Sequence, residues 1–165
     1  MSHFSAIARL IDKNQSIVVS SQTHEAINNL LKSVQRNAES LSSTPFVVKL
    51  SSGTSEKSDQ RSLSGTKVQA LRENDLNSKA NVLGATVFSL VKERFGEEPY
   101  DLLVVDEAGQ VSLSNLLYMS HCARNILLVG DQNQLSQPNR AKHPGDSGLS
   151  CLEYVMGKEK VVPVS

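Results

Sequence analysis

The chain has 165 residues with 17 basic and 17 acidic side chains, so no net charge points to nucleic acid, although zero net charge does not exclude a locally basic groove. Its 39% hydrophobic and 21% charged residues are typical of one soluble globular domain. Cys122 and Cys151 are too few for a disulfide framework, and no apolar run reaches membrane length. We therefore expect a cytoplasmic protein with no membrane partner.

The first third of the chain alternates between helical and extended patterns. Apolar spacing predicts a helix over 4–11, a strand at 17–20, and a second helix capped by Thr23. The apolar face of that second helix comprises Ala26, Ile27, Leu30, Leu31 and Val34. A second strand is predicted at 46–50.

A serine-rich stretch follows the second strand. Residues 51–64 contain almost no large apolar side chains, which predicts a mobile surface loop extending to about residue 66. A weak helix is predicted over 66–73. We expect this loop to contribute little to the core.

The second half of the chain continues the alternation of strands and helices. Strands are predicted at 81–85, 102–105 and 125–129, and the first of them ends at Thr86. Helices are predicted after each strand, the last around residues 149–156. The predicted sheet core comprises Val18, Val19, Val104, Val105, Leu127 and Leu128.

This alternation predicts an α/β domain with a mainly parallel sheet. Right-handed crossovers place the carboxyl ends of all strands at one edge, where α/β sheets bind ligands. Polar side chains follow directly on four strands, so we expect them to share one crevice. They are Ser20, Ser21, Thr23 and His24; Thr86; Asp106 and Glu107; and Asp131 and Gln134.

The adjacent carboxylates of Asp106 and Glu107 follow an apolar run that ends at Val105. In a nucleoside triphosphatase, the first acid of such a pair holds Mg²⁺ and the second positions the attacking water. Acidic residues at the start of a helix, where they complement the helix dipole, are the simpler interpretation of the pair alone. The surrounding motifs decide between these interpretations.

Three segments in order resemble motifs of the superfamily 1 DNA/RNA helicases, in the branch of the nonsense-mediated-decay helicase and bacterial RecB-like nuclease-helicase fusions. Residues 18–26 (VVSSQTHEA) resemble motif Ia, 104–110 (VVDEAGQ) motif II, also called Walker B, and 129–135 (VGDQNQL) motif III. Residues 143–150 (HPGDSGLS) resemble the segment that follows motif III in the bacterial members. The resemblance implies a RecA-like P-loop nucleoside triphosphatase fold that uses ATP and Mg²⁺.

The resemblance also implies a role for individual residues. Asp106 would bind Mg²⁺, Glu107 would be the general base, and Gln134 would sense the γ-phosphate. Asp131 and Gln110 would join the nucleotide to the nucleic-acid surface. The backbone of single-stranded DNA or RNA would contact Ser20, Ser21, Thr23, His24 and Thr86.

One motif of this family is missing from the sequence. The phosphate-binding loop, G-x-x-x-x-G-K-[ST], has no match, since the single Gly-Lys pair, Gly157-Lys158, precedes Glu159. We therefore expect residues 1–165 to be part of the first RecA-like domain, without its phosphate-loop strand, and to need the rest of a helicase chain as partner. Alone it should be marginally stable and inactive. The alternative is a non-hydrolysing single-strand-binding or regulatory module.

Overall fold

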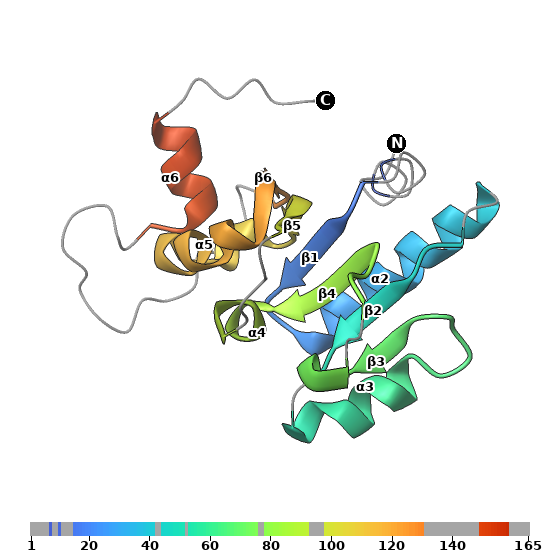
Figure 1. Ribbon diagram of the computed structural model, residues 1–165. Coiled ribbons are helices and arrows are strands. Elements are labelled where there is room, and N and C mark those ends of the chain that lie inside the picture. The colour runs from blue at the N-terminus through green and yellow to red at the C-terminus, as the bar shows by residue number, and fades with distance from the viewer. Residues whose placement is uncertain are drawn as a thin grey trace.

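A computed structural model describes residues 7, 10, 15–41, 44–51, 53–75, 78–92, 98–130 and 149–158. These residues form one six-stranded sheet in the order β3-β2-β4-β1-β5-β6, and every neighbouring pair is parallel (Figure 1). The strands are β1 (Ile17–Ser21), β2 (Val47–Leu50), β3 (Gln69–Leu71), β4 (Val82–Thr86), β5 (Tyr100–Val105) and β6 (Ala123–Leu128). The predicted parallel α/β fold is confirmed.

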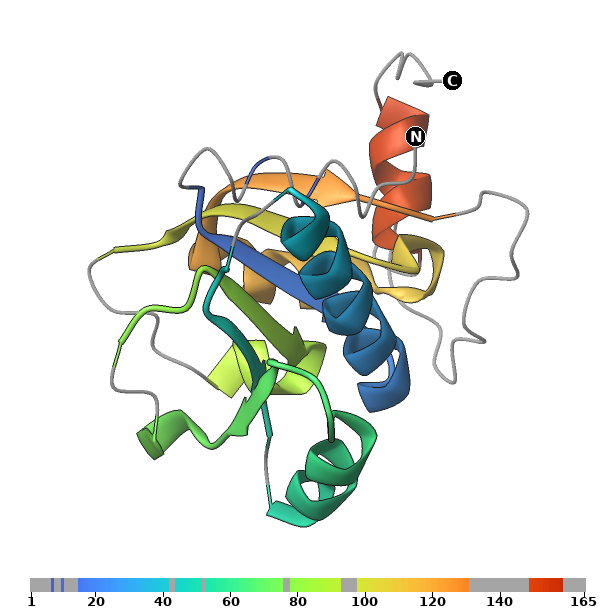
Figure 2. The same cartoon turned by 90° about the vertical axis from the view of Figure 1, so that its right-hand side faces the viewer.

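Helices cover both faces of the sheet, with α2 lying across one of them (Figure 2). The described helices are α2 (His24–Ser40), α3 (Glu56–Ser62), α4 (Val87–Lys92), α5 (Leu113–Met119) and α6 (Cys151–Lys158). Single turns of 3-10 helix lie at η1 (Gly53–Ser55), η2 (Glu73–Asp75), η3 (Ala108–Gln110) and η4 (Ser120–Cys122). No described helix is long and apolar enough to cross a membrane.

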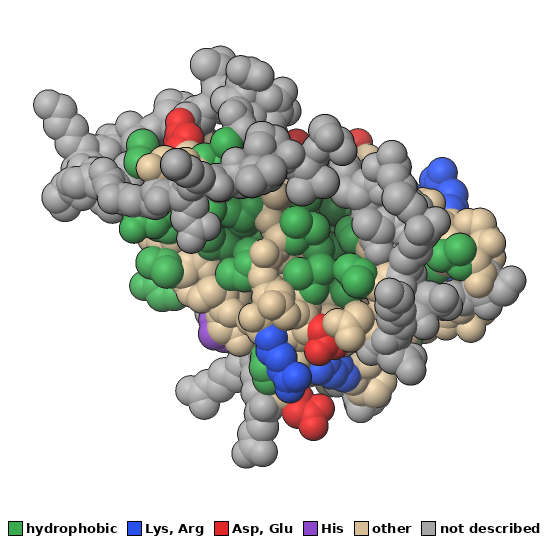
Figure 3. All heavy atoms as spheres, turned by 90° about the horizontal axis from the view of Figure 1, so that it is seen from above, with side chains coloured by type: hydrophobic (Ala, Val, Ile, Leu, Met, Phe, Trp, Pro, Cys, Tyr) green, Lys and Arg blue, Asp and Glu red, His purple; other side chains and the backbone are tan. Residues whose placement is uncertain are grey.

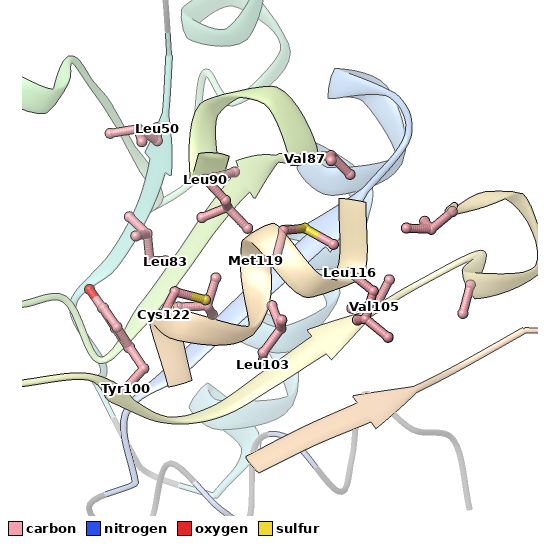
Figure 4. Close-up of a cluster of buried hydrophobic side chains, with 14 of the residues drawn as sticks. Leu50, Leu83, Val87, Leu90, Tyr100, Leu103, Val105, Leu116, Met119 and Cys122 are labelled. Carbon is pink, nitrogen blue, oxygen red and sulfur yellow. The ribbon is translucent and has the colours of Figure 1, made fainter. Parts of the chain in front are cut away.

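The central strand β1 divides the core into two layers because successive side chains of a strand point to opposite faces. Val19 packs with the apolar face of α2, whereas Val18 packs on the other side with Leu103 and Met119. Figure 4 shows this second layer, where side chains of α4 and α5 meet those of β4 and β5. All five residues of β1 are buried, as expected for a strand covered on both faces.

Gly84 allows α2 to lie unusually close to the sheet. A Cβ atom at this position would be 2.6 Å from Leu31 Cδ1 and 2.8 Å from Ile27 Cγ2. Both of those side chains are fully buried. Any larger residue in place of Gly84 would therefore force the side chains of Leu31 and Ile27 to shift.

Of the six predicted core residues, Leu127 is exposed and Leu128 packs against the edge of the core. Leu127 is 41% exposed and Leu128 is half-buried, whereas Val18, Val19, Val104 and Val105 are buried. Within the described part of the chain β6 pairs with β5 alone, so it is an edge strand. Ile126, which precedes Leu127 in β6, is also 41% exposed. Figure 3 looks from above, the side on which β6 lies in Figure 1, and shows hydrophobic side chains gathered at the surface.

The serine-rich segment also differs from the expected loop. It forms η1 and the seven-residue helix α3, which buries Asp59 and is followed by the buried Leu63. The predicted weak helix over 66–73 is wrong, because residues 69–71 form β3 and pair with β2. Tertiary hydrogen bonding at the sheet edge overrides local propensity here.

Candidate nucleotide and nucleic-acid site

The strand register aligns several predicted site residues at one edge of the sheet. Ser21 pairs with Thr86, and Ser20 pairs with Val105, the residue before Asp106. The ends of β1, β4 and β5 therefore lie at the same level. The predicted Asp131 and Gln134 fall within 131–148, outside the described residues.

The two carboxylates sit in a constrained turn. Asp106 N donates to Ser20 O at 2.8 Å, and Asp106 Oδ1 accepts from Glu107 N at 3.1 Å. Glu107 adopts left-handed backbone angles (φ 55°, ψ 40°), which no other non-glycine residue with a described conformation shares. Such a conformation costs about 1–3 kcal/mol and persists only where the surroundings enforce it.

Three contacts enforce this turn. Ala108 N donates to Val129 O at 2.9 Å, and Gln110 N donates to Glu107 O at 2.8 Å. From the other side, Cys151 Sγ donates to Ala108 O at 3.2 Å. The turn after β5 is thus held by the end of β6 and by the start of α6.

The buried Cys151 has a structural role. Burial raises the pKa of its thiol to about 11, so the sulfur stays protonated and acts as a hydrogen-bond donor. Its backbone N donates to Val111 O at 2.7 Å, and next to it Ser150 bridges to Ser112. A cysteine in this state is a poor nucleophile and a poor metal ligand.

Ser21 connects the motif Ia segment to the acid pair. Its Oγ donates to Glu107 Oε2 at 3.3 Å, and its side chain is fully buried. Ser20 is also fully buried, and its Oγ has no hydrogen-bond partner among the described atoms. This burial does not support direct contact of Ser20 and Ser21 with an external strand.

The other predicted strand contacts lie at helix starts. Thr23 is exposed, and its Oγ1 accepts from Ala26 N at 3.1 Å as the N-cap of α2. His24 begins α2, and its side chain is 40% exposed. Thr86 is buried, and its Oγ1 accepts from Ser89 N at 3.3 Å in the first turn of α4. Thr23 and His24 are therefore the members of this set that solvent reaches.

Sequence reasoning missed two residues at this edge. Gln22 Nε2 donates to the backbone O of Gln110 at 2.8 Å, which joins the segment after β1 to η3. Phe88 is 73% exposed on the first turn of α4, directly after Thr86 and Val87. Its neighbours Val87 and Leu90 are buried, so an apolar helical pattern alone does not separate Phe88 from the core residues of α4.

The family model of an AAA domain matches residues 5–137, which is well over half of the sequence. The chain belongs to this AAA domain family. The family is a helicase-like group of P-loop domains. The finer assignment to the nonsense-mediated-decay branch is not established by this match.

A search of curated proteins finds no match. Among solved structures, the AAA domain is similar to the Sulfolobus solfataricus SWI2/SNF2 ATPase core in complex with dsDNA, at 15% sequence identity and a TM-score of 0.42. The match covers 78% of this chain and 30% of that chain, so the AAA domain spans less than a third of that structure's length.

The acid pair of the AAA domain fits the Mg²⁺ and ATP that its family implies. No group of three or more His, Cys, Asp and Glu side chains in the described ranges could hold a metal. Mg²⁺ in nucleotide sites needs fewer protein ligands, since it uses one or two carboxylates together with waters and phosphates. Asp106 is half-buried at a strand end and supplies one such carboxylate. Gly130, after β6, allows the backbone to pass close to the turn that carries the acid pair, because a Cβ there would be 3.2 Å from the backbone N of Ala108 and of Gly109.

Proposed function

We propose that this AAA domain is part of an ATP-dependent nucleic-acid motor and links nucleotide hydrolysis to the binding of single-stranded DNA or RNA. The observation that carries this proposal is the hydrogen bond between Ser21 Oγ and Glu107 Oε2. It connects the segment leading into α2 directly to the acid that would act on water. A displacement of Ser21 would therefore change the position of the Glu107 carboxylate, and the reverse.

In this function Asp106 and Glu107 have different roles. Asp106 would hold Mg²⁺, which neutralises charge on the phosphates. Glu107 would accept a proton from the attacking water as general base. Its carboxylate is oriented by Ser21 and by the constrained backbone of the turn. Gln110, Asp131 and Gln134 would complete the nucleotide contacts.

The nucleic acid would lie over the exposed side chains at the carboxyl edge. Thr23 and His24 would contact its backbone, and Thr86 would position the start of α4 that carries Phe88. An exposed phenylalanine offers a flat apolar face on which a base can stack. Stacking of this kind tolerates any sequence, as a motor requires.

The chain contains no phosphate-loop motif of its own. We therefore propose that residues 1–165 alone bind a single strand without hydrolysing ATP, and that hydrolysis needs a loop and arginines from elsewhere. The second candidate, a binding module with no catalytic role, is favoured by the same absence. The retained Glu107 favours the first, because pure binding has no use for a water-positioning acid.

The test uses the lack of tryptophan in the sequence. A Phe88→Trp variant has a single tryptophan, whose fluorescence a stacked base quenches. We expect oligonucleotide-dependent quenching that salt reverses. The control is Leu41→Trp, which is also exposed, at 42% against 73% for Phe88, but caps the opposite end of the 17-residue helix α2, roughly 25 Å from His24. Absence of binding by anisotropy of a labelled oligonucleotide would refute the proposal.

A further inference from the structure

A lysine and an aspartate lie buried together beyond the nucleotide site. Lys49 on β2 has a side chain 0% exposed, and Asp59 on α3 has one 1% exposed. Their Nζ and Oδ2 atoms are 3.7 Å apart. Removing two charges from water costs more than such a pair usually returns, so a buried ion pair is weak evidence of a stabilising role. We therefore expect a role of the Lys49–Asp59 pair other than stabilising the fold.

The surrounding hydrogen bonds hold both charges in place. Asp59 Oδ2 accepts from Ser51 Oγ at 2.7 Å, and its Oδ1 accepts from Asn28 Nδ2 at 3.0 Å. Lys49 Nζ donates to Leu50 O at 2.6 Å. Burial opposes the charge on Asp59, but the bonds from Ser51 and Asn28 lower its pKa on balance. Burial lowers the pKa of Lys49, and Asp59 counters that shift.

His24 connects this buried pair to solvent. Its Nδ1 is 3.3 Å from Lys49 Nζ, in a hydrogen bond, and 3.4 Å from Asp59 Oδ2. An ammonium group can only donate, so the bond from Lys49 requires Nδ1 to accept, which in a neutral ring places the proton on Nε2. A proton on Nδ1 would instead face Asp59 Oδ2. The side chain is 40% exposed, and no described residue accepts a hydrogen bond from Nε2. With this tautomer, Nε2–H is an N–H donor on the solvent side of the ring.

We propose that Lys49 and Asp59 are positioning residues that fix the ring and tautomer of His24, so that its Nε2–H donates to a phosphate oxygen of a bound single strand. This inference rests on the proposed function. Thr23 beside it accepts the capping bond from Ala26 N and keeps its hydroxyl hydrogen, so His24 Nε2–H would be a second side-chain donor at this exposed helix start. Asp59 is the buried residue of α3. The helix formed by the serine-rich segment would therefore be needed to position His24.

The first measurement is the tautomer of His24 by ¹⁵N nuclear magnetic resonance at neutral pH. We expect the Nε2–H form in the unmodified chain and its loss in Lys49→Met, where Nδ1 has only Asp59 as partner. Asp59→Asn keeps the shape of the side chain and tests the second positioning residue if Lys49→Met fails to fold. Glu56→Gln, on the same helix but paired with Arg72 at the surface, is the matched control and should leave the tautomer unchanged.

The second measurement is affinity for a labelled single-stranded oligonucleotide. His24→Ala should weaken binding roughly tenfold, as expected for one hydrogen bond to a charged group. Lys49→Met should cause a similar loss in the unmodified chain and none in the His24→Ala background, because both act through the same donor. Glu56→Gln should bind normally.

The outcomes separate this inference from the proposed function. An Nδ1–H tautomer in the unmodified chain, or undiminished strand binding by His24→Ala, would overturn the inference and leave the proposed function standing. An additional loss from Lys49→Met in the His24→Ala background would overturn it too. Absence of strand binding by every variant, including the unmodified chain, would overturn the proposed function and with it the phosphate contact.

Discussion

Gln22 Nε2 and the backbone O of Gln110 are joined by a 2.8 Å hydrogen bond between segments 88 residues apart. It ties the segment after β1 to the turn that carries the acid pair. Gln22→Ala should reduce the free energy of unfolding by about 1 kcal/mol, the usual contribution of one such bond. Urea denaturation followed by circular dichroism measures this. Gln60→Ala, exposed on α3, is the control and should have no measurable effect.

Truncating one member of the buried pair should be costly. Asp59→Ala leaves Lys49 as an uncompensated buried charge, so we expect a loss of about 3–5 kcal/mol. Replacing both residues with apolar ones, as in Lys49→Met with Asp59→Leu, should cost less than Asp59→Ala alone. Thermal and urea unfolding check both. Glu39→Gln, in an exposed pair with Lys67, should leave the free energy of unfolding unchanged. Equal losses of stability in Asp59→Ala and Glu39→Gln would contradict the expected difference between buried and exposed pairs.

Acid should destabilise the fold through Asp59 and Asp101. Ser16 donates to Asp101 Oδ2 from both its backbone N and its Oγ, at 2.8 Å each, and these bonds lower the pKa of Asp101. The pKa of Asp59 is also lowered in the folded chain. As the pH falls below the ordinary value of 3.8, the unfolded chain takes up protons first, so stability present above that pH is lost. Asp101→Asn should flatten this loss in urea titrations across the acid range, whereas Asp75→Asn, exposed in η2, should not.

The left-handed conformation of Glu107 predicts that a substitution which stabilises the fold would also remove the proposed general base. Glycine adopts this conformation without the steric cost, so Glu107→Gly should stabilise the chain by on the order of 1 kcal/mol. Glu107→Gln keeps the strain and should give no such gain. Both substitutions remove the proposed base. A loss of stability in Glu107→Gly would show that the Ser21 hydrogen bond outweighs the strain.

The purified chain should release no phosphate from ATP above background. Phosphoryl transfer depends on positioning and charge stabilisation, and an arginine finger alone is worth roughly 10³–10⁵ in rate. The assay is phosphate release with Mg²⁺ and single-stranded nucleic acid, run on the chain and on Glu107→Gln. Robust release that disappears in the variant would mean that residues 1–165 hold a complete nucleotide site.

The sheet was predictable from sequence because its central strands are strongly apolar. Val18, Val19, Val104 and Val105 could be placed in the core from the apolar pattern alone, and the end of each strand indicated the position of Asp106. The same logic failed for Leu127. Its apolar run resembles that of a central strand, but edge position depends on which strands pair, and pairing is a tertiary property.

The side-chain chemistry of the edge was less predictable. A serine after a strand can face a ligand or a neighbouring carboxylate, and only the register with β5 shows that Ser21 faces Glu107. Asp59 lies in a stretch whose composition indicates a loop, and its burial depends on Lys49 in β2 and on Asn28, which is 31 residues away in sequence. Local patterns contain no information on such partners. The roles of Asp131 and Gln134 stay predictions.

The edge strand β6 also affects the tendency of the purified chain to associate with itself. It presents apolar side chains together with a row of backbone groups that no described strand pairs, and such an edge is a template for another strand. The concentration of the sample therefore becomes an experimental variable, because self-association through β6 would compete with every binding measurement. Polar substitution at Ile126 should extend the usable range, since charged side chains are the means by which natural edges avoid joining.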